Sequence, residues 1–168
     1  MTAVETAQRN FGYTTIALKC NTLHIDTSFP AKDDEDIYPG MLLLAEEDSD
    51  GVWTTIKCTV DASDADGKTP VIGLAMEKRE VGETIHDVYD DGENVIAVVP
   101  HKGDKVLVRV YNGEDVSTLD YLVSNGDGTV RVADSGEYYV ALFQAAGDCD
   151  MTQSDEDDEI ALVPAYVL

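Results

Sequence analysis

The sequence contains few basic residues and no long apolar run. Eleven lysines and arginines stand against 34 aspartates and glutamates, which gives a net charge of −23. Proteins that bind nucleic acid or anionic membranes do so through lysine and arginine, so this deficit argues against both partners. No apolar run approaches the roughly 20 residues that a membrane-spanning helix needs. The opening string MTAVETAQRN also lacks the basic and apolar pattern of a secretory signal.

Cysteine is rare, and its spacing excludes the usual roles of paired thiols. Cys20, Cys58 and Cys149 form no CxxC pair, which argues against a zinc knuckle and against a thioredoxin-like redox site. Three cysteines in a chain of 168 residues are also too few for a disulfide scaffold. We therefore expect these side chains to be small buried apolar groups.

Motifs that carry catalysis or bind metal ions are missing as well. The three histidines stand far apart and are expected at surface or turn positions, although His86 followed by Asp87 could pair a base with an orienting carboxylate. The sequence contains no nucleophile elbow and no glycine-rich phosphate loop. Residues 125–129 resemble part of a calcium loop but lack its closing glutamate, so we expect a turn. We assign no catalytic residue, no metal ligand and no cofactor.

What the sequence has in excess is carboxylate, and the acids are scattered over many loops. Such charges repel one another at low salt, whereas near 1 M ionic strength the screening length falls to about 3 Å and the repulsion largely vanishes. The composition therefore predicts a protein of a halophile or of a halophile's virus. The alternative is an ordinary acidic protein with a basic partner.

Short apolar runs alternate with turn signals along most of the chain. Asn-Gly, Asp-Gly and Pro-Gly pairs separate the runs, and these dipeptides favour tight turns. The pattern predicts an all-β fold, a small barrel-like or β-sandwich domain, with little helix beyond a short turn around Ser117–Leu122. The run Val106–Val110 alternates only weakly, so we expect it to be buried on both faces. The expected strands are 14–20, 41–45, 52–60, 71–76, 95–99, 106–111, 130–132, 138–143 and 160–167.

Charge is distributed unevenly along the chain. Residues 1–32 contain two acids and three bases, a net charge of +1, so residues 33–168 have a net charge of −24. If the solvent-facing surface is acidified for brine, a nearly acid-free segment is expected to lie against another protein, although part of it is typical of a buried strand. We therefore divide the chain into an extended N-terminal arm with the first strand (1–37) and a β-rich domain (38–168).

Four consecutive segments share their arrangement with one known family. A Pro-Gly turn opens an apolar strand in Tyr38–Trp53, and a Pro-Val-x-Gly-hydrophobic-Ala string precedes a Gly-x-x-Ile step in Thr69–Pro100. A Gly-Asp strand and a Gly-x-Gly turn follow in His101–Ala133, and a Val-Ala-hydrophobic strand ends the series in Tyr138–Asp150. In this order the segments, which span about three-quarters of the chain, resemble the small capsid decoration (cement) proteins of tailed viruses.

The resemblance implies a barrel-like domain, usually trimeric, that sits on the outside of the capsid and stabilises it. The implied partners are the major capsid protein and further copies of the chain, with no nucleic acid and no membrane. Together with the charge, it implies a virion location in a virus made in the cytoplasm of a halophilic archaeon. An arm of this kind could add a strand to a capsid sheet, and we select Phe11, Tyr13, Ile16 and Leu18 as its anchors. Packing of these side chains against their own domain is an equally open alternative.

Two other functions stay open at this point. A virion turret or receptor-binding module would share the composition and the fold, and would show an exposed aromatic patch for which Trp53, Tyr89 and Tyr111 are candidates. A small halophilic β-fold enzyme would need a polar pocket, which one sequence does not reveal.

Overall fold

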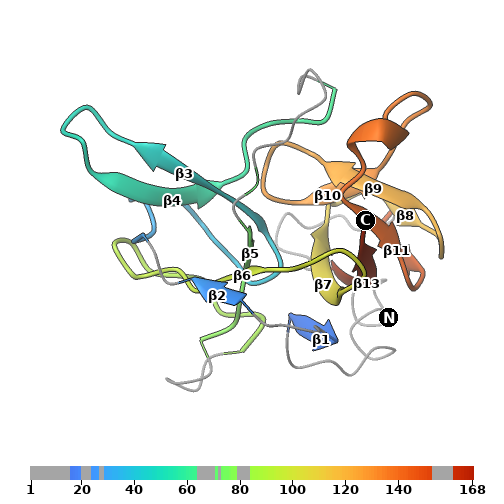
Figure 1. The fold of residues 1–168 in the computed structure, drawn as a ribbon, viewed down its shortest axis with the longest axis horizontal. Coiled ribbons are helices and arrows are strands. Elements are labelled where there is room, and N and C mark those ends of the chain that lie inside the picture. Colours follow the sequence, from blue (N-terminus) through green and yellow to red (C-terminus); the bar gives the residue numbers. More distant parts are fainter. Residues whose placement is uncertain are drawn as a thin grey trace.

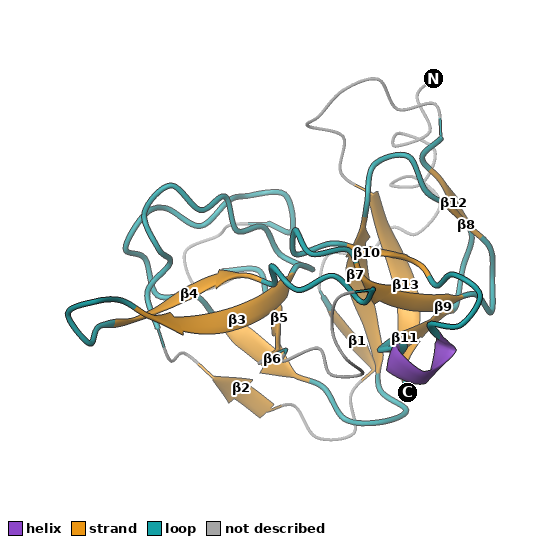
Figure 2. Ribbon diagram, turned by 90° about the horizontal axis from the view of Figure 1, so that it is seen from above, coloured by secondary structure: helices purple, strands orange, loops and turns teal. Residues whose placement is uncertain are grey.

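The computed structural model confirms the all-β prediction (Figure 1). It describes residues 16–19, 24–26, 29–63, 71, 73–78, 84–152 and 161–168. Within these residues the regular structure consists of β-strands and one short 3₁₀ helix, η2 (Tyr138–Val140). Two groups of strands lie side by side, as the view in Figure 2 shows, and a two-stranded ribbon lies beside the larger group.

The larger group closes into a barrel. Its strands are β1 (Ala17–Lys19), β7 (Lys105–Val110), β9 (Tyr121–Ser124), β10 (Val130–Val132), β11 (Phe143–Ala145) and β13 (Ala161–Val167). They follow the order β1-β7-β10-β9-β11-β13, and β13 pairs with β7 as well. This additional pairing closes β7, β10, β9, β11 and β13 into a five-stranded barrel, to which β1 adds on the outside of the ring.

Apolar side chains fill the interior of the barrel. Alternate residues of β13 pair with alternate residues of β7, and the buried inner pairs are Ala161 with Val110, Val163 with Val108 and Ala165 with Val106. The register places the larger side chains of Phe143 and Leu122 on the same inward face, and both are buried, so the ring is filled by its own side chains. The outward residues Leu107 and Arg109 are buried as well, Arg109 against the turn at residues 38–40, and this confirms the expectation for Val106–Val110.

The second group is a five-stranded sheet in the order β2-β6-β5-β3-β4. Its strands are β2 (His24–Asp26), β3 (Leu42–Glu47), β4 (Trp53–Lys57), β5 (Gly73–Ala75) and β6 (Ala97–Val99). Residues 29–32 bond to β4 on one side and to residues 92–95 on the other, so the sheet curves around its own small core. Tyr89 plugs this core, where its hydroxyl donates to Met76 O at 2.7 Å and accepts from Ile96 N at 3.1 Å.

A Pro-Gly turn at residues 38–40 joins the two groups. The Gly40 N–H donates to Ala75 O of the second sheet at 2.8 Å, and Gly40 O accepts from Arg109 N of the barrel at 2.9 Å. Gly40 has a φ of +88°, and a Cβ there would stand 2.6 Å from Leu162 Cδ2. Glycine is therefore required both by the backbone conformation and by the close approach.

The side chain of Arg109 fills the same junction. Arg109 is 5% exposed, donates from Nη2 to Pro39 O at 3.2 Å, and lies over the ring of Tyr38 at 4.7 Å. Burial lowers the pKa of Arg109 to about 9, which leaves the guanidinium charged at neutral pH. At this junction a backbone carbonyl and the face of an aromatic ring thus stabilise a buried cation.

Three parts of the fold differ from the sequence-based expectation. The run 138–143 was expected to be a strand, but Tyr138–Val140 form η2 and the strand β11 begins only at Phe143. A turn is present after Ser117, but it does not open a helix: the Asp120 carboxylate accepts from Ser117 N, and β9 begins at Tyr121. The ribbon of β8 (Asp115–Val116) and β12 (Cys149–Asp150) was not expected.

Gly73 provides a test of the β5–β6 packing. A Cβ at Gly73 would stand 2.7 Å from the backbone oxygen of Val98, although the φ of Gly73 is not in the left-handed region. We expect Gly73→Ala to lower the free energy of unfolding by about 1–3 kcal/mol through overpacking. Urea denaturation at fixed salt measures this change. Gly103→Ala, where φ is +88° and the surrounding space is open, is the control, and a smaller loss at Gly73 than at Gly103 would contradict the packing.

Candidate interaction surface

The N-terminal segment contributes an edge strand to each sheet. β1 pairs with β7 of the barrel and β2 pairs with β6, and each stands at the end of its strand order. Ile16, just before β1, is fully buried: its N–H donates to Glu77 Oε2 at 3.0 Å and its carbonyl accepts from Leu107 N at 2.8 Å. The described part of residues 1–37 is therefore hydrogen-bonded into the fold.

The four predicted arm anchors have different positions. Phe11 and Tyr13 lie outside the described residues. Ile16 belongs to the main core of its own domain, and Leu18 is half-buried against that core, which is where the alternative placed them. Binding of a capsid protein by this segment stays a prediction.

Of the three residues that were candidates for an exposed aromatic patch, Trp53, Tyr89 and Tyr111, one is not exposed. Tyr89 is buried, because its hydroxyl satisfies two backbone groups inside the second sheet and its ring lies under the ammonium of Lys78 at 4.8 Å. Trp53 and Tyr111 are exposed. Trp53 stacks on Phe29 with ring centroids 5.9 Å apart, near the β3–β4 hairpin.

Sequence reasoning missed a group of tyrosines on the outside of the barrel. Tyr121 on β9 and Tyr138 on η2 are exposed and have ring centroids 5.5 Å apart, and Tyr166 on β13 is exposed as well. The alternation Tyr121-Leu122-Val123 is a signal for one outward residue. Which outward residues become neighbours, however, depends on the strand order, which the sequence pattern does not contain.

The His86–Asp87 pair does not form a base with an orienting carboxylate. The Asp87 carboxylate instead accepts from the N–H and the hydroxyl of Thr84, at 2.6 and 2.9 Å. Burial lowers the pKa of His86, and the nearby Arg109 lowers it further. His86 is therefore a turn residue that is neutral at pH 7.

The string at residues 125–129 is a turn, as expected. Asp127 accepts from the N–H of Thr129 at 2.9 Å and from its hydroxyl, and Gly126 and Gly128 have positive φ angles. Across the described ranges, no three histidine, cysteine, aspartate or glutamate side chains cluster in a way that could hold a metal ion.

Both described cysteines are buried, which confirms the expectation for Cys58 and Cys149; Cys20 lies outside the described residues. Burial raises the pKa of the Cys149 thiol to about 11, and the neighbouring carboxylates of Asp150 and Asp115 act in the same direction. The thiol is therefore protonated and unreactive at neutral pH.

An apolar cavity of about 220 Å³ lies between β5 and the barrel. Its lining includes Leu74, Val99, Leu142, Phe143 and Leu168, and each described lining residue is apolar or glycine. It thus offers no side chain that could act as an acid, a base or a nucleophile. In the part of the chain that the structure describes, no helix is long and apolar enough to cross a membrane.

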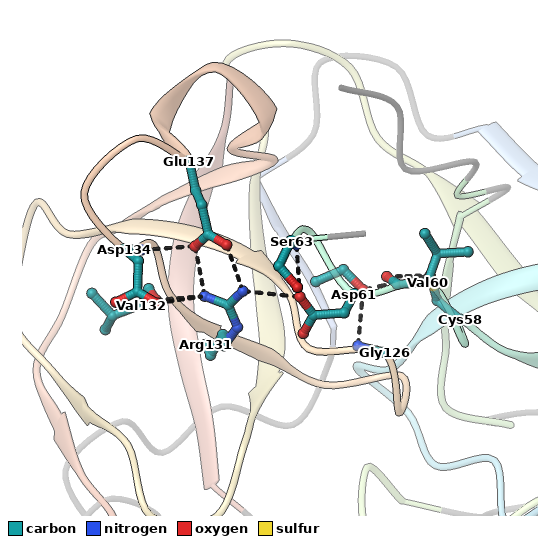
Figure 3. Close-up of polar contacts among 10 residues, drawn as sticks. Cys58, Val60, Asp61, Ser63, Gly126, Arg131, Val132, Asp134 and Glu137 are labelled. Atoms are coloured by element: carbon teal, nitrogen blue, oxygen red, sulfur yellow. Dashed lines mark hydrogen bonds and ion pairs between the residues drawn. The ribbon is translucent and has the colours of Figure 1, made fainter. Parts of the chain in front are cut away.

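Arg131 of β10 ties three separate segments together (Figure 3). Its guanidinium forms a two-pronged ion pair with Glu137, with nitrogen–oxygen distances of 2.7 and 2.8 Å, and donates to Asp61 Oδ1 at 3.1 Å. Asp61 follows the second sheet, whereas Glu137 precedes η2, so one side chain connects the barrel with both. Two-pronged pairs of this geometry are the stronger kind of ion pair.

The same contacts shift the acidity of both carboxyl groups. Hydrogen bonding from Arg131 lowers the pKa of Glu137, and burial opposes this only in part. Burial raises the pKa of Asp61, but hydrogen bonds from Arg131 and Ser63 outweigh it and leave the pKa lowered. A lowered folded-state pKa stabilises the protein above the unfolded-state pKa, and this stabilisation is lost as the pH falls through the folded-state pKa.

Replacing Arg131 tests this network. We expect Arg131→Met to lower the free energy of unfolding by about 1–2 kcal/mol at pH 7, because two carboxylates lose charged hydrogen bonds. The difference from the parent chain should shrink as the pH falls from about 5 to about 3, where the carboxylates become protonated. Denaturation across this pH range measures it. Lys32→Met, which removes the exposed pair with Glu46 at 2.6 Å, is the control and should change stability little; a difference for Arg131→Met that does not depend on pH would contradict the assignment.

Comparison with known proteins identifies a similar fold. No protein-family model matches the chain, and no curated protein matches its sequence. Among solved structures, the crystal structure of the N base of head fiber gp8.5 in bacteriophage phi29 aligns with a TM-score of 0.51. The alignment covers 88% of this chain and 95% of that chain at 14% sequence identity. The two chains therefore share a fold over most of their length.

Proposed function

We propose that the chain is a non-enzymatic structural protein of a tailed virus, which binds the outside of the capsid shell and stabilises it as a trimer. The observation that carries the proposal is the shared fold with the N base of a bacteriophage head fiber, which extends over 95% of that chain. The family resemblance of residues 38–150, identified from the sequence alone, favours the same setting.

The N-terminal segment supports the proposal by its charge and its place in the fold. Residues 1–32 have a net charge of +1 in a chain of −23, and β1 and β2 stand at sheet edges. An edge strand has unpaired backbone groups that can bond to a strand of another protein. Trimerisation would add avidity to a contact that is weak for each copy.

A second candidate, a virion turret or receptor-binding module, is favoured by the exposed tyrosines on the barrel. Tyr121, Tyr138 and Tyr166 are large aromatic side chains that the fold leaves in solvent. Tyrosine is common in recognition surfaces, because it offers a large contact area with few rotatable bonds. Binding of the chain to host cells, in the absence of binding to shells, would favour this candidate.

Shell binding by the arm can be measured directly. We expect the full chain to bind undecorated shells of its virus in molar salt, with saturation at a fixed ratio to the major capsid protein. A chain that lacks residues 1–13 should bind at least tenfold more weakly, because it loses the acid-poor segment with Phe11 and Tyr13. Cosedimentation of shells with labelled protein measures both affinities.

The deletion must stop before Ile16, because this residue is part of the core. An unchanged melting temperature of the shortened chain is the control for its folding. Saturable binding that survives the deletion would move the contact into the β domain, and no binding at any salt concentration would overturn the proposal.

We propose that the natural setting is molar salt, within a halophilic archaeon and its virus. The support is the net charge of −23, whose repulsion destabilises the compact chain when it is not screened. We expect the melting temperature at pH 7 to rise by about 5 °C or more between 0.05 and 0.5 M sodium chloride. At pH near 3.5 the rise should be much smaller, because many carboxylates are protonated. A salt response equal at both pH values would show that charge screening is not its cause.

A further inference from the structure

A row of side chains crosses the outside of the barrel. Strand pairing places Tyr121 of β9 beside Gln144 of β11, Gln144 beside Tyr166 of β13, and Tyr166 beside Lys105 of β7. Lys105 in turn pairs with Lys19 of β1. Directly paired residues point to the same face of a sheet, so the first four form one continuous row, and Lys19 extends it next to a register shift in β1. We call it the tyrosine–lysine row, and none of its positions holds a carboxylate.

The two lysines of the row have no carboxylate partner among the described residues. The structure gives Lys105 a contact with the ring of Tyr166, 5.6 Å from its centroid, and gives Lys19 no ion pair within the described ranges. Like charges directly opposite each other weaken a sheet. In a chain with 34 acids and 11 bases, these two adjacent cations therefore lack a carboxylate partner within the described residues.

The β3–β4 hairpin has the complementary character. Glu47 pairs with Trp53 across the hairpin, and both are exposed, as are Asp50 and Val52 at its tip. The turn is preformed, because the Asp48 carboxylate accepts from the N–H groups of Asp50 and Val52, each at 2.9 Å. We call residues 47–53 the acidic hairpin tip: it combines exposed apolar side chains with carboxylates.

The acidic hairpin tip and the barrel that carries the row lie toward opposite ends of the molecule. Figure 1 shows the β3–β4 hairpin projecting at one end of the long axis and the barrel at the other. Two different, complementary patches on one chain make a head-to-tail contact, which closes into a ring when the rotation between copies permits it. We infer that the tyrosine–lysine row of one copy binds the acidic hairpin tip of a second copy.

A second copy fits the row because both its charge and its apolar groups match. The row presents ammonium groups beside tyrosine rings, and the tip presents carboxylates beside Trp53 and Val52. The net charge of −23 on each copy opposes this contact at low salt, so molar salt favours it through screening and through stronger apolar association. The inference deepens the self-association included in the proposed function and does not depend on shell binding.

A charge exchange tests the pairing. The purified full chain is studied by sedimentation equilibrium at 1 M potassium chloride. We expect Lys105→Glu to weaken self-association about tenfold, and Glu47→Lys to weaken it similarly, because each removes an attraction and adds a repulsion. The double variant, which restores opposite charges and the parent net charge, should return to within about threefold of the parent affinity.

A second double variant distinguishes the effect of the specific charge pair from the effect of the net charge. Lys105→Glu combined with Asp115→Lys has the same net charge as the first double variant, but Asp115 lies on β8, outside both surfaces. It should remain weakened. Recovery by both double variants would show that only net charge matters and would overturn the inference.

The tyrosines allow a further test of the contact that changes no charge. Tyr166 and Tyr111 are 45% and 42% exposed, and Tyr111 lies six residues beyond Lys105, just after the far end of β7. We expect Tyr166→Ser to weaken association and Tyr111→Ser to leave it unchanged, with melting temperatures as the check on folding. Equal effects would overturn the inference, and so would a parent chain that stays monomeric at every salt and protein concentration. The proposed shell binding would then still be decided by the cosedimentation measurement.

Discussion

A buried cation, Arg109, stabilises the junction on which the arrangement of the two groups of strands depends. It lies where the barrel meets the second sheet, and it takes the carbonyl of Pro39 and the ring of Tyr38 as its partners. A guanidinium is costly to bury, and these contacts offset the cost only when the turn at residues 38–40 is in place. Because Gly40 bonds to both sheets in the same turn, the side-chain contact and the backbone contacts form together. The two ends of the molecule therefore have a fixed relative position, as a head-to-tail contact requires.

Much of the fold follows from sequence, because apolar runs and turn dipeptides mark the strands that bury large side chains. Eight of the nine expected ranges overlap a strand of the structure by three residues or more, from β1 to β13. The strands that were missed, β2, β8, β9 and β12, have two to four residues each, too few for a pattern, and their partners hold them in place. The error at Tyr138 has another cause: the run looks apolar, but only Val140 of η2 is buried.

The candidate surfaces were predictable only in part. Charge counting identified residues 1–32 as unusual, and the structure makes the described part of this segment the edge of both sheets. Charge counting did not identify the tyrosine–lysine row. The residues of this row, Tyr121, Gln144, Tyr166, Lys105 and Lys19, come from five strands spread over most of the chain. Only the strand order brings them together, and strand order is set by long-range packing that no local pattern encodes.

The pairing of β13 with β7 has a consequence for how the protein folds. Ala161 pairs with Val110, so the barrel cannot close until a strand about fifty residues further along the chain has been synthesised. Contacts this distant in sequence make folding slow, because the entropy of a long loop is lost before the contact forms. Until then β7 and β11 are exposed strands that can pair with other chains. In molar salt the repulsion between carboxylates is screened and no longer keeps such unfinished chains apart, so the stage before the barrel closes is the one at which mispairing between chains is easiest.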